Sequence, residues 1–244
     1  MNADYDVLWS EAWPLLQSIG PLTRSRYRLI ERELGPLLRP DSTVLDVGCG
    51  NGTLLRRLSL KHAGARLNGI EPSSQALAQA DPAIRGFIRN GDLDAELPRF
   101  HDDPVDLLVS SEVIEHLADP AHALGMMLPA LKRGGTAVFT VPARKHLWSS
   151  QDEFAGHVQR FELPEFRRLL KDAGFEVARA YCWGIGPALL YDRLTAWLGP
   201  QRTIGAGRSR GGARLASLLY YGFLIEDLFR TRFGFQLVAV ARRV

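Results

Sequence analysis

The sequence is poor in cysteine, in net charge and in long apolar runs. Cys49 and Cys182 are the two cysteines among 244 residues, and neither belongs to a Cys-x-x-Cys pair, which argues against a disulfide framework or a zinc site. Lys and Arg total 30 against 27 Asp and Glu, and a formal charge of +3 is too small to favour nucleic acid as a partner. The longest apolar run, residues 215–225, is too short to span a membrane.

Signals for export and for separate domains are also missing. Asp4, Asp6 and Glu11 lie where a secretory signal needs basic residues followed by an apolar core, so we expect a cytoplasmic protein. No Ser-, Pro- or Gly-rich linker interrupts the chain, and its 46% apolar residues suffice for a core. We therefore predict a single domain over residues 1–244.

Short apolar runs alternate with helical patterns from residue 43 onward. We expect strands at residues 43–47, 66–70, 87–89, 105–110, 136–141, 175–183 and 235–241. This alternation predicts an α/β fold, a doubly wound Rossmann-like sheet. We assign residues 41–183 and 233–244 to this core.

Two further segments flank the core. Residues 1–40 contain an amphipathic helix at 24–38 and form an N-terminal helical lid in our interpretation. Residues 184–232 form a helical insertion with apolar helices at 188–198 and 215–229. A Gly-rich loop between those helices carries Arg202, Arg208, Arg210 and Arg214. An apolar and basic insertion suits an amphiphilic acceptor or contact with an anionic membrane surface. Alternatively, its helices pack on the fold and its arginines lie in water.

The most informative motif is a glycine-rich turn that follows the first strand. The turn comprises Asp46, Gly48, Cys49, Gly50, Asn51 and Gly52, and a helix begins near Thr53. A turn of this kind lets a ligand approach the backbone. Thr53 replaces the third glycine of the dinucleotide fingerprint, and no Lys-Ser or Lys-Thr follows, so neither a nicotinamide cofactor nor ATP is favoured.

Acidic residues follow the next two strands. Glu71 and Pro72 come after the second strand, where a carboxylate can bind both hydroxyls of a ribose. Asp92 and Leu93 follow the third strand, where a carboxylate and the next amide can bind adenine. The three loops together outline a nucleoside.

In this order of motifs the chain resembles the class I S-adenosylmethionine-dependent methyltransferases, over residues 40–183 and the last strand. The resemblance implies a seven-stranded sheet whose last strand is antiparallel, and S-adenosylmethionine as the cofactor. It implies that Glu71 binds the ribose, that Asp92 and Leu93 bind the adenine, and that residues 46–52 bind the methionine portion. Ser110 and Ser111, at the end of the fourth strand, would flank the methionine end.

We expect the helix after the fourth strand to begin at Ser111, which places Glu112, Glu115 and His116 on one helical face. His116 is then the candidate general base for a hydroxyl acceptor, because an imidazole titrates near neutral pH. A structural role, with the acids favouring the helix N-terminus and His116 bonding a nearby loop, is the alternative.

The same residues have a second interpretation. Glu-x-x-Glu-His resembles the metal-binding cluster of ubiquinone-type O-methyltransferases and small-RNA 2′-O-methyltransferases, and His157 is a further candidate ligand. Two carboxylates and an imidazole suit Mg²⁺ or a similar ion. We assign no metal at this point.

The predicted function is methyl transfer to a small-molecule or amphiphilic acceptor at a hydroxyl oxygen. Asn-Pro-Pro-Tyr is absent after the fourth strand, which disfavours methylation of base amines, and Cys49 lies in the cofactor turn, so no covalent nucleophile is available. The loop with His146 and Trp148, together with His157 and Arg160, is a candidate wall of the acceptor pocket. A catalytically silent cofactor-binding protein and a nucleoside-cofactor oxidoreductase are the alternatives.

Overall fold

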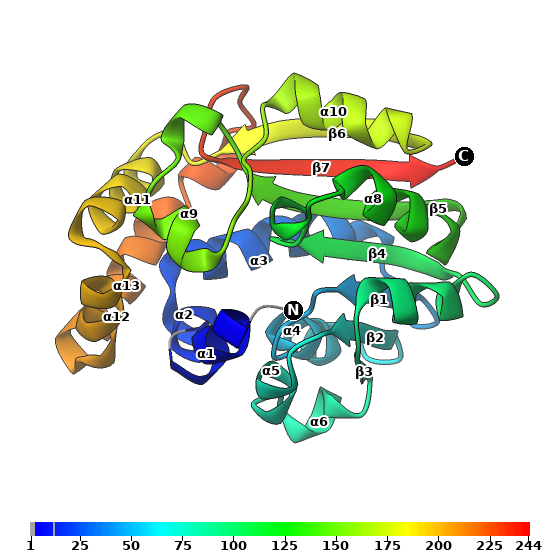
Figure 1. The fold of residues 1–244 in the computed structure, drawn as a ribbon, viewed down its shortest axis with the longest axis horizontal. Helices are drawn as coiled ribbons and strands as arrows, with labels where there is room; N and C mark the ends of the chain where they lie inside the picture. The colour runs from blue at the N-terminus through cyan, green and yellow to red at the C-terminus, as the bar shows by residue number, and fades with distance from the viewer. Residues whose placement is uncertain (1–2, 12) are drawn as a thin grey trace.

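A seven-stranded sheet forms the centre of the protein in a computed structural model that describes residues 3–11 and 13–244 (Figure 1). The strands are β1 (Thr43–Val47), β2 (Arg66–Glu71), β3 (Ile88–Asn90), β4 (Val105–Ser111), β5 (Leu131–Pro142), β6 (Phe175–Trp183) and β7 (Gln236–Arg243). Their order is β3-β2-β1-β4-β5-β7-β6, and β7 is antiparallel to both of its neighbours. The predicted fold class is confirmed, including the antiparallel last strand.

Helices cover both faces of the sheet. The longer helices of the core are α3 (Pro21–Leu34), α4 (Thr53–Lys61), α8 (Pro120–Ala130) and α10 (Leu163–Asp172). Short helices join them: α5 (Ser74–Ala78), α6 (Pro82–Arg85), α7 (Leu93–Glu96) and α9 (Ser150–Ala155). Single 3-10 turns are η1 (Gly35–Leu37), η2 (Leu97–Phe100), η3 (Ile114–His116), η4 (Lys145–Leu147) and η5 (Glu226–Leu228).

Alternation of side chains along the strands creates two apolar layers. Leu45 and Val47 of β1 face the side that α8 and α10 cover, whereas Val44 faces α3 and α4. Leu29 and Leu34 of α3 are fully buried in the second layer, so α3 belongs to the packed body of the protein.

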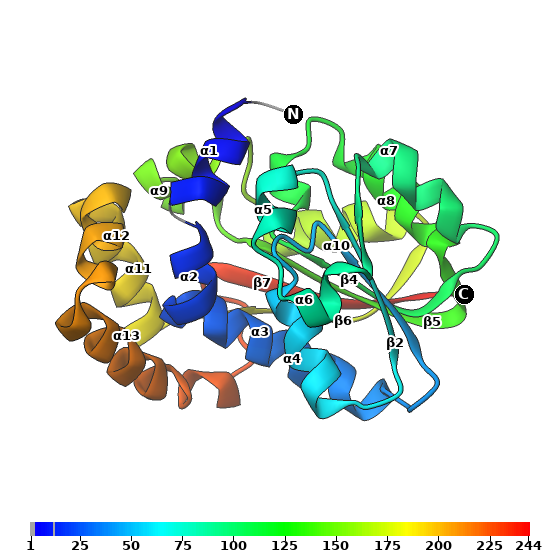
Figure 2. The same ribbon diagram turned by 90° about the horizontal axis from the view of Figure 1, so that it is seen from below.

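Two groups of helices lie at the carboxyl ends of the parallel strands. One group is α1 (Ala3–Glu11) and α2 (Trp13–Ile19), and the other is α11 (Pro187–Leu198), α12 (Pro200–Arg208) and α13 (Arg210–Phe223). Figures 1 and 2 both place these helices and α9 at the same end of the molecule. Ligands of open α/β sheets bind at this edge, so the arrangement locates the site.

The insertion differs from the sequence-based expectation in one respect. The predicted basic loop is helical, because α12 ends at Arg208 and α13 begins at Arg210, with Ser209 accepting a hydrogen bond from the amide of Gly212 at 2.9 Å. Tertiary contacts override the modest cost of glycine within a helix. The side chains of Arg208 and Arg210 lie outside the described residues. None of the helices over residues 3–11 and 13–244 combines the length and apolarity needed to cross a bilayer.

Candidate active site

The glycine turn after β1 has the left-handed backbone that its composition predicts. Gly48, Gly50 and Gly52 have φ of +71°, +57° and +72°, which residues with a side chain rarely adopt. The amide of Gly48 donates to the carbonyl of Ile70 at 2.8 Å and ties the turn to β2. A Cβ at Gly50 would lie 2.5 Å from the ring of Trp9, so the close approach also requires glycine.

Two buried carboxyl groups lie behind this turn. Glu71 is fully buried at the end of β2, and its carboxylate accepts from the amides of Gly50 at 2.8 Å and Ser73 at 2.9 Å. Asp46 is buried at the end of β1, and burial together with the charge of Glu71 raises the pKa of Asp46 to about 8. The carboxylate of Glu71, the predicted ribose ligand, therefore lies beside the glycine turn and holds its backbone through a hydrogen bond.

The remaining cofactor candidates around β2 and β3 occupy loop and helix ends. Asn51 accepts from the amide and hydroxyl of Thr53 at 3.3 and 2.7 Å and so supports the start of α4. The carbonyl of Pro72 accepts from the side chain of Asn90, which links the ends of β2 and β3. Asp92 is exposed directly before α7, and Leu93 begins that helix with its side chain against the core.

The segment after β4 corrects the sequence-based prediction. Residues 111–117 do not form a helix that places Glu112, Glu115 and His116 on one face. β4 continues through Ser111, Glu112 turns the chain with a φ of +58°, and α8 begins only at Pro120, where Asp119 caps it. A proline in the first turn and a capping aspartate are strong local start signals, and they fix the helix start nine residues later than predicted.

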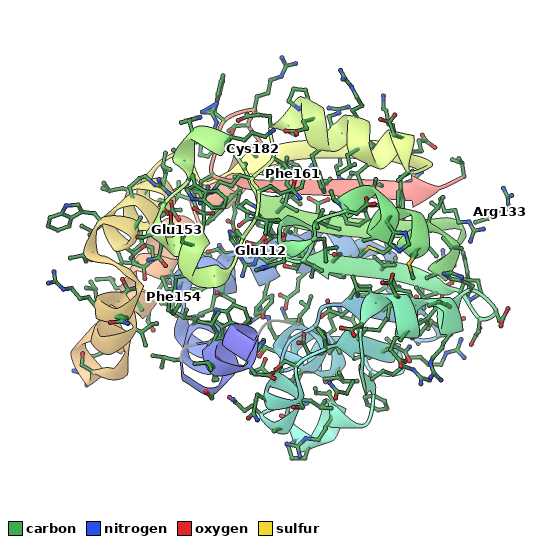
Figure 3. All side chains as sticks on the ribbon, viewed as in Figure 1. Glu112, Arg133, Glu153, Phe154, Phe161 and Cys182 are labelled. Atoms are coloured by element: carbon green, nitrogen blue, oxygen red, sulfur yellow. The ribbon has the colours of Figure 1, made fainter. Side chains whose placement is uncertain are left out.

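The carboxylate of Glu112 is consequently held by residues other than the predicted ones. Its carboxylate pairs with the guanidinium of Arg26 at 2.9 Å and accepts from Gln236 at 2.8 Å and Thr140 at 3.1 Å. Figure 3 shows Glu112 at the end of the sheet covered by α9, opposite the end that holds Arg133. Ser110 is fully buried, while Ser111 bonds Thr140 at 2.9 Å and faces the cavity.

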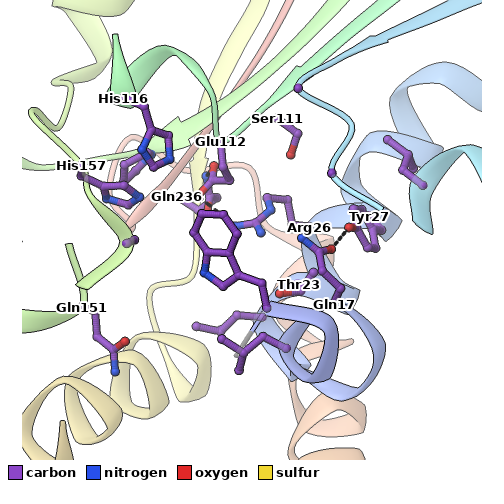
Figure 4. A pocket seen from close by; sticks show the side chains of 18 of the residues that line it. Gln17, Thr23, Arg26, Tyr27, Ser111, Glu112, His116, Gln151, His157 and Gln236 are labelled. Atoms are coloured by element: carbon purple, nitrogen blue, oxygen red, sulfur yellow. Dashed lines mark hydrogen bonds and ion pairs between the residues drawn. The ribbon is translucent and has the colours of Figure 1, made fainter. Parts of the chain in front are cut away.

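Glu115, His116 and His157 meet beside the cavity. One ligand atom of each lies within 4.8 Å of the others, which is compatible with a metal ion. The two imidazole rings are 4.8 Å apart between centroids, and Figure 4 shows them side by side, across the pocket from Gln17 and Tyr27. Glu115 is fully buried, and neither of its oxygens has a hydrogen-bond partner among the described residues.

Asp152 organises the wall next to this cluster. Its buried carboxylate accepts from both sides of the Arg160 guanidinium at 2.7 and 2.9 Å, from Nδ1 of His157 at 2.9 Å and from the amide of Ser149 at 2.8 Å. Burial alone raises the pKa of Asp152, but the hydrogen bonds from His157 and Arg160 outweigh it and hold that pKa well below its usual range. Asp152 is therefore an anion that orients His157 and leaves Nε2 of that ring facing Glu115 at 3.8 Å.

The protonation states of His116 and Glu115 follow from burial. Nδ1 of His116 lies 3.1 Å from the carbonyl of Gly156, so this nitrogen carries a proton and Nε2 has a free lone pair. Burial and the neighbouring His157 lower the pKa of His116 to about 4, which keeps the ring neutral at pH 7. Burial and the charge of Glu112 raise the pKa of Glu115 well above its usual value.

A cavity of about 250 Å³ joins the glycine turn to the histidine cluster. Six predicted site residues line it: Asp46, Gly48, Cys49, Gly50, Ser111 and His116. Seven others are not among its lining residues: Asn51, Gly52, Glu71, Pro72, Asp92, Leu93 and Ser110. His157 and Arg160 of the predicted acceptor wall line the cavity, whereas His146 and Trp148 are exposed outside it.

Several lining residues are not among the site residues predicted from the sequence, although four of them belong to the predicted N-terminal lid and Asp152 to the loop predicted as a pocket wall. They are Arg26 and Tyr27 from α3, Trp9 and Trp13 from the N-terminal helices, Asp152 from α9, Asp192 from α11 and Gln236 from β7. They come from segments far apart in the chain and belong to no local motif. The signal that could have found one of them is the Ser-x-x-Asp capping pattern at residues 149–152, which predicts the start of α9 and thereby the place of Asp152.

Comparison with known proteins is consistent with this geometry. Residues 22–180 match the family described as a methyltransferase domain. A ubiquinone biosynthesis O-methyltransferase of Nitrosomonas europaea is 31% identical over 133 residues, which cover 51% of this chain and 52% of that protein. A probable S-adenosylmethionine-dependent methyltransferase of Mycolicibacterium smegmatis is 32% identical over 137 residues, 55% of this chain and 52% of that protein. The aligned part thus spans about half the length of these curated relatives.

Solved structures share the fold over nearly the whole chain. A putative methyltransferase in complex with the Haloferax volcanii Trm112 activator matches with a TM-score of 0.66 and 21% identity, over 99% of this chain and 98% of that one. Geranyl diphosphate C-methyltransferase of Streptomyces coelicolor matches with a TM-score of 0.59 and 16% identity, over 100% of this chain and 86% of that one. At sequence identities this low, the structural similarity shows a shared fold only. Family membership is shown by the matched methyltransferase domain. The chain belongs to the class I S-adenosylmethionine-dependent methyltransferases.

Proposed function

We propose that this protein transfers the methyl group of S-adenosylmethionine to a hydroxyl oxygen of a small-molecule or amphiphilic acceptor. One observation carries the proposal: a single cavity has the glycine turn on one side and His116 and His157 on the other. An acceptor hydroxyl between them would lie near both a methyl donor and a base. The ubiquinone O-methyltransferase among the relatives supports an oxygen acceptor.

The cofactor is assigned along the carboxyl edge of β1, β2, β3 and β4. Glu71 and Pro72 serve the ribose, and Asp92 and Leu93 serve the adenine. The turn at residues 46–52, with Ser110 and Ser111, serves the methionine portion. Arg26 is added to this set, because its guanidinium lines the same cavity and suits the methionine carboxylate.

Catalysis then consists of alignment and proton removal. S-adenosylmethionine, when bound, would supply an electrophilic methyl group, whose transfer to the acceptor oxygen would break the carbon–sulfur bond and release the thioether with the electron pair. The hydroxyl proton passes to an imidazole. His116 is neutral, and its free Nε2 accepts the hydrogen bond and then the proton of the hydroxyl, while the anionic Asp152 orients His157 beside it.

Glu115, His116 and His157 also fit a divalent cation. The fit rests on the buried Glu115 carboxyl without a hydrogen-bond partner among the described residues and on two imidazoles whose second nitrogens are held by Gly156 and Asp152. Two imidazoles and one carboxylate suit Zn²⁺, Mn²⁺ or Fe²⁺ better than Mg²⁺. A bound cation would lower the pKa of an acceptor hydroxyl. If turnover is unchanged after a chelator is added, the metal hypothesis is rejected and the two histidines act without a cation.

The insertion is the proposed contact for an amphiphilic acceptor or its membrane. Leu190, Trp197, Leu218, Ile225 and Leu228 are each more than 60% exposed. Arg202, Arg214, Arg230 and Arg232 are exposed too, whereas Asp192 and Glu226 are buried. Co-sedimentation with anionic but not with zwitterionic vesicles, reduced in Trp197→Ser, would support this contact. Equal recovery with both vesicle types would contradict it.

Ligand-dependent thermal stability tests the cofactor. S-adenosylmethionine and S-adenosylhomocysteine should raise the melting temperature, while NAD and ATP should not, because only ligands of the native state stabilise it. A panel of phenols, catechols and aliphatic alcohols with labelled cofactor then tests the acceptor atom. Methylation of amines but not of hydroxyls would overturn the oxygen assignment.

A further inference from the structure

Helix α1 covers the glycine turn of the cofactor site. Trp9 is only 2% exposed, and its ring lies directly on the backbone of Gly50, where a Cβ would come within 2.5 Å of the ring. Trp9 and Trp13 pack edge to face with 5.2 Å between ring centroids, and both line the cavity. The N-terminal segment thus forms a wall of the same cavity as the glycine turn.

Two polar contacts fasten α1 to the segment that follows β2. The side-chain amide of Gln79 donates to the carbonyl of Trp9, and the hydroxyl of Ser73 donates to Asp6. Figure 2 shows α1 next to α5, the helix that begins at Ser74. These fastening groups lie only a few residues beyond Glu71, the proposed ribose ligand.

Glu71 is fully buried and accepts a hydrogen bond from the amide of Gly50, the residue on which the Trp9 ring lies. The indole N–H of Trp9 is buried and has no hydrogen-bond partner among the described residues. A buried donor without a partner is unfavourable, and a bound ligand with acceptor oxygens would satisfy it.

We propose that α1 is a gate on the cofactor site, held shut by Gln79 and Ser73, and that Trp9 donates a hydrogen bond from its indole to the bound cofactor. Entry and release both require α1 to leave Gly50, and the closed gate then excludes water from the bound sulfonium. This inference rests on the proposed function, since it takes S-adenosylmethionine as the ligand.

Rates of cofactor exchange test the gate without any acceptor. Tritiated S-adenosylmethionine is bound to the full chain, and its release is followed after addition of excess S-adenosylhomocysteine. Association is followed separately by rapid filtration. The variants are Gln79→Ala, which unfastens the gate, and Trp9→Phe, which keeps a ring but removes the donor. Gln75→Ala is the matched control, because Gln75 is exposed on helix α5, which ends just before Gln79. Circular dichroism establishes that each variant folds.

Gln79→Ala should accelerate association and release together by about 2- to 10-fold, the effect of one hydrogen bond on the opening equilibrium, and leave the dissociation constant nearly unchanged. Trp9→Phe should accelerate release more than association, and Gln75→Ala should change neither rate. Unchanged rates in Gln79→Ala would overturn the gate. Faster association with tighter binding would also overturn it, since α1 would then compete with the cofactor. If neither the wild type nor the variants bind the cofactor, the proposed function fails together with the gate.

Discussion

Replacing Asp152 by asparagine is the most informative single perturbation of this site. The carboxylate is buried, holds both sides of the Arg160 guanidinium at 2.7 and 2.9 Å, and accepts from His157 at 2.9 Å. Breaking a buried ion pair by removing one charge typically costs about 3–5 kcal/mol, because the remaining charge stays buried without its partner. We expect Asp152→Asn to lower the free energy of unfolding by that amount.

The pH dependence of this loss has a definite sign. The usual pKa of an aspartate is 3.8, and that of Asp152 in the folded protein is lower. The stabilisation is therefore complete above about pH 4 and is lost as the pH falls through the folded pKa. The difference between wild type and variant should be constant from pH 5 to pH 8 and should shrink below about pH 4.

Urea denaturation at several pH values measures both effects. Glu153→Gln is the matched control, since Glu153 is exposed on the same helix, and it should change stability by less than about 0.5 kcal/mol. Replacing Arg160 by methionine in the Asp152→Asn background should recover part of the loss, because no buried charge then remains unpaired. A loss below about 1 kcal/mol for Asp152→Asn would refute the reasoning. A loss that does not begin to shrink as the pH falls below about 4 would also refute it.

Four further predictions test the turn, the cluster and the core. Gly50→Ala should cost at least about 1–2 kcal/mol of stability and weaken S-adenosylmethionine binding in calorimetry, because its φ is +57° and a Cβ there would lie 2.5 Å from the Trp9 ring. Gly35→Ala should be neutral, because Gly35 has a right-handed conformation and open space around it. Glu115→Gln should leave metal-free stability in urea unchanged or higher, because its carboxyl has no hydrogen-bond partner among the described residues, and a loss above about 2 kcal/mol would contradict this. The pKa of His116 is lowered to about 4, so between pH 6.5 and pH 4 the unfolded chain binds a proton at this residue more readily than the folded protein does. The free energy of unfolding of the wild type should therefore decrease as the pH is lowered from 6.5 to 4, and His116→Gln should reduce this decrease. Phe166→Ala should cost about 3–5 kcal/mol in urea unfolding, since Phe166 is fully buried, and full stability would contradict its place in the core.

Local patterns in the sequence account for the fold and for half of the site. The strands at Thr43–Val47 and Phe175–Trp183 have the predicted bounds, because alternating or continuous apolar runs are typical of strands that are buried in a sheet. The left-handed turn at Gly48, Gly50 and Gly52 was predictable for a similar reason, since glycine alone adopts such a backbone without strain. The longer extent of β5 was not predicted, because Leu131 to Gly135 carry no strand pattern. Leu131 joins the strand by pairing with Val105 of β4, ahead of an irregularity in the register.

The tertiary structure alone decided how the side of the cavity that holds His116 and His157 is assembled. Glu112 leaves the helix predicted for it because Arg26, Thr140 and Gln236, from three distant segments, hold its carboxylate. His157 meets Glu115 and His116 because the chain, after α8 and β5, returns through α9 to the same edge of the sheet. There the amide of Val158 donates to the carbonyl of Glu115 at 3.0 Å. The sequence by itself determined the positions of the strands and the glycine turn, since both follow from local residue patterns. The charge pairs and the covering of Gly50 by Trp9 join residues far apart in the chain, and only the packed molecule brings them together.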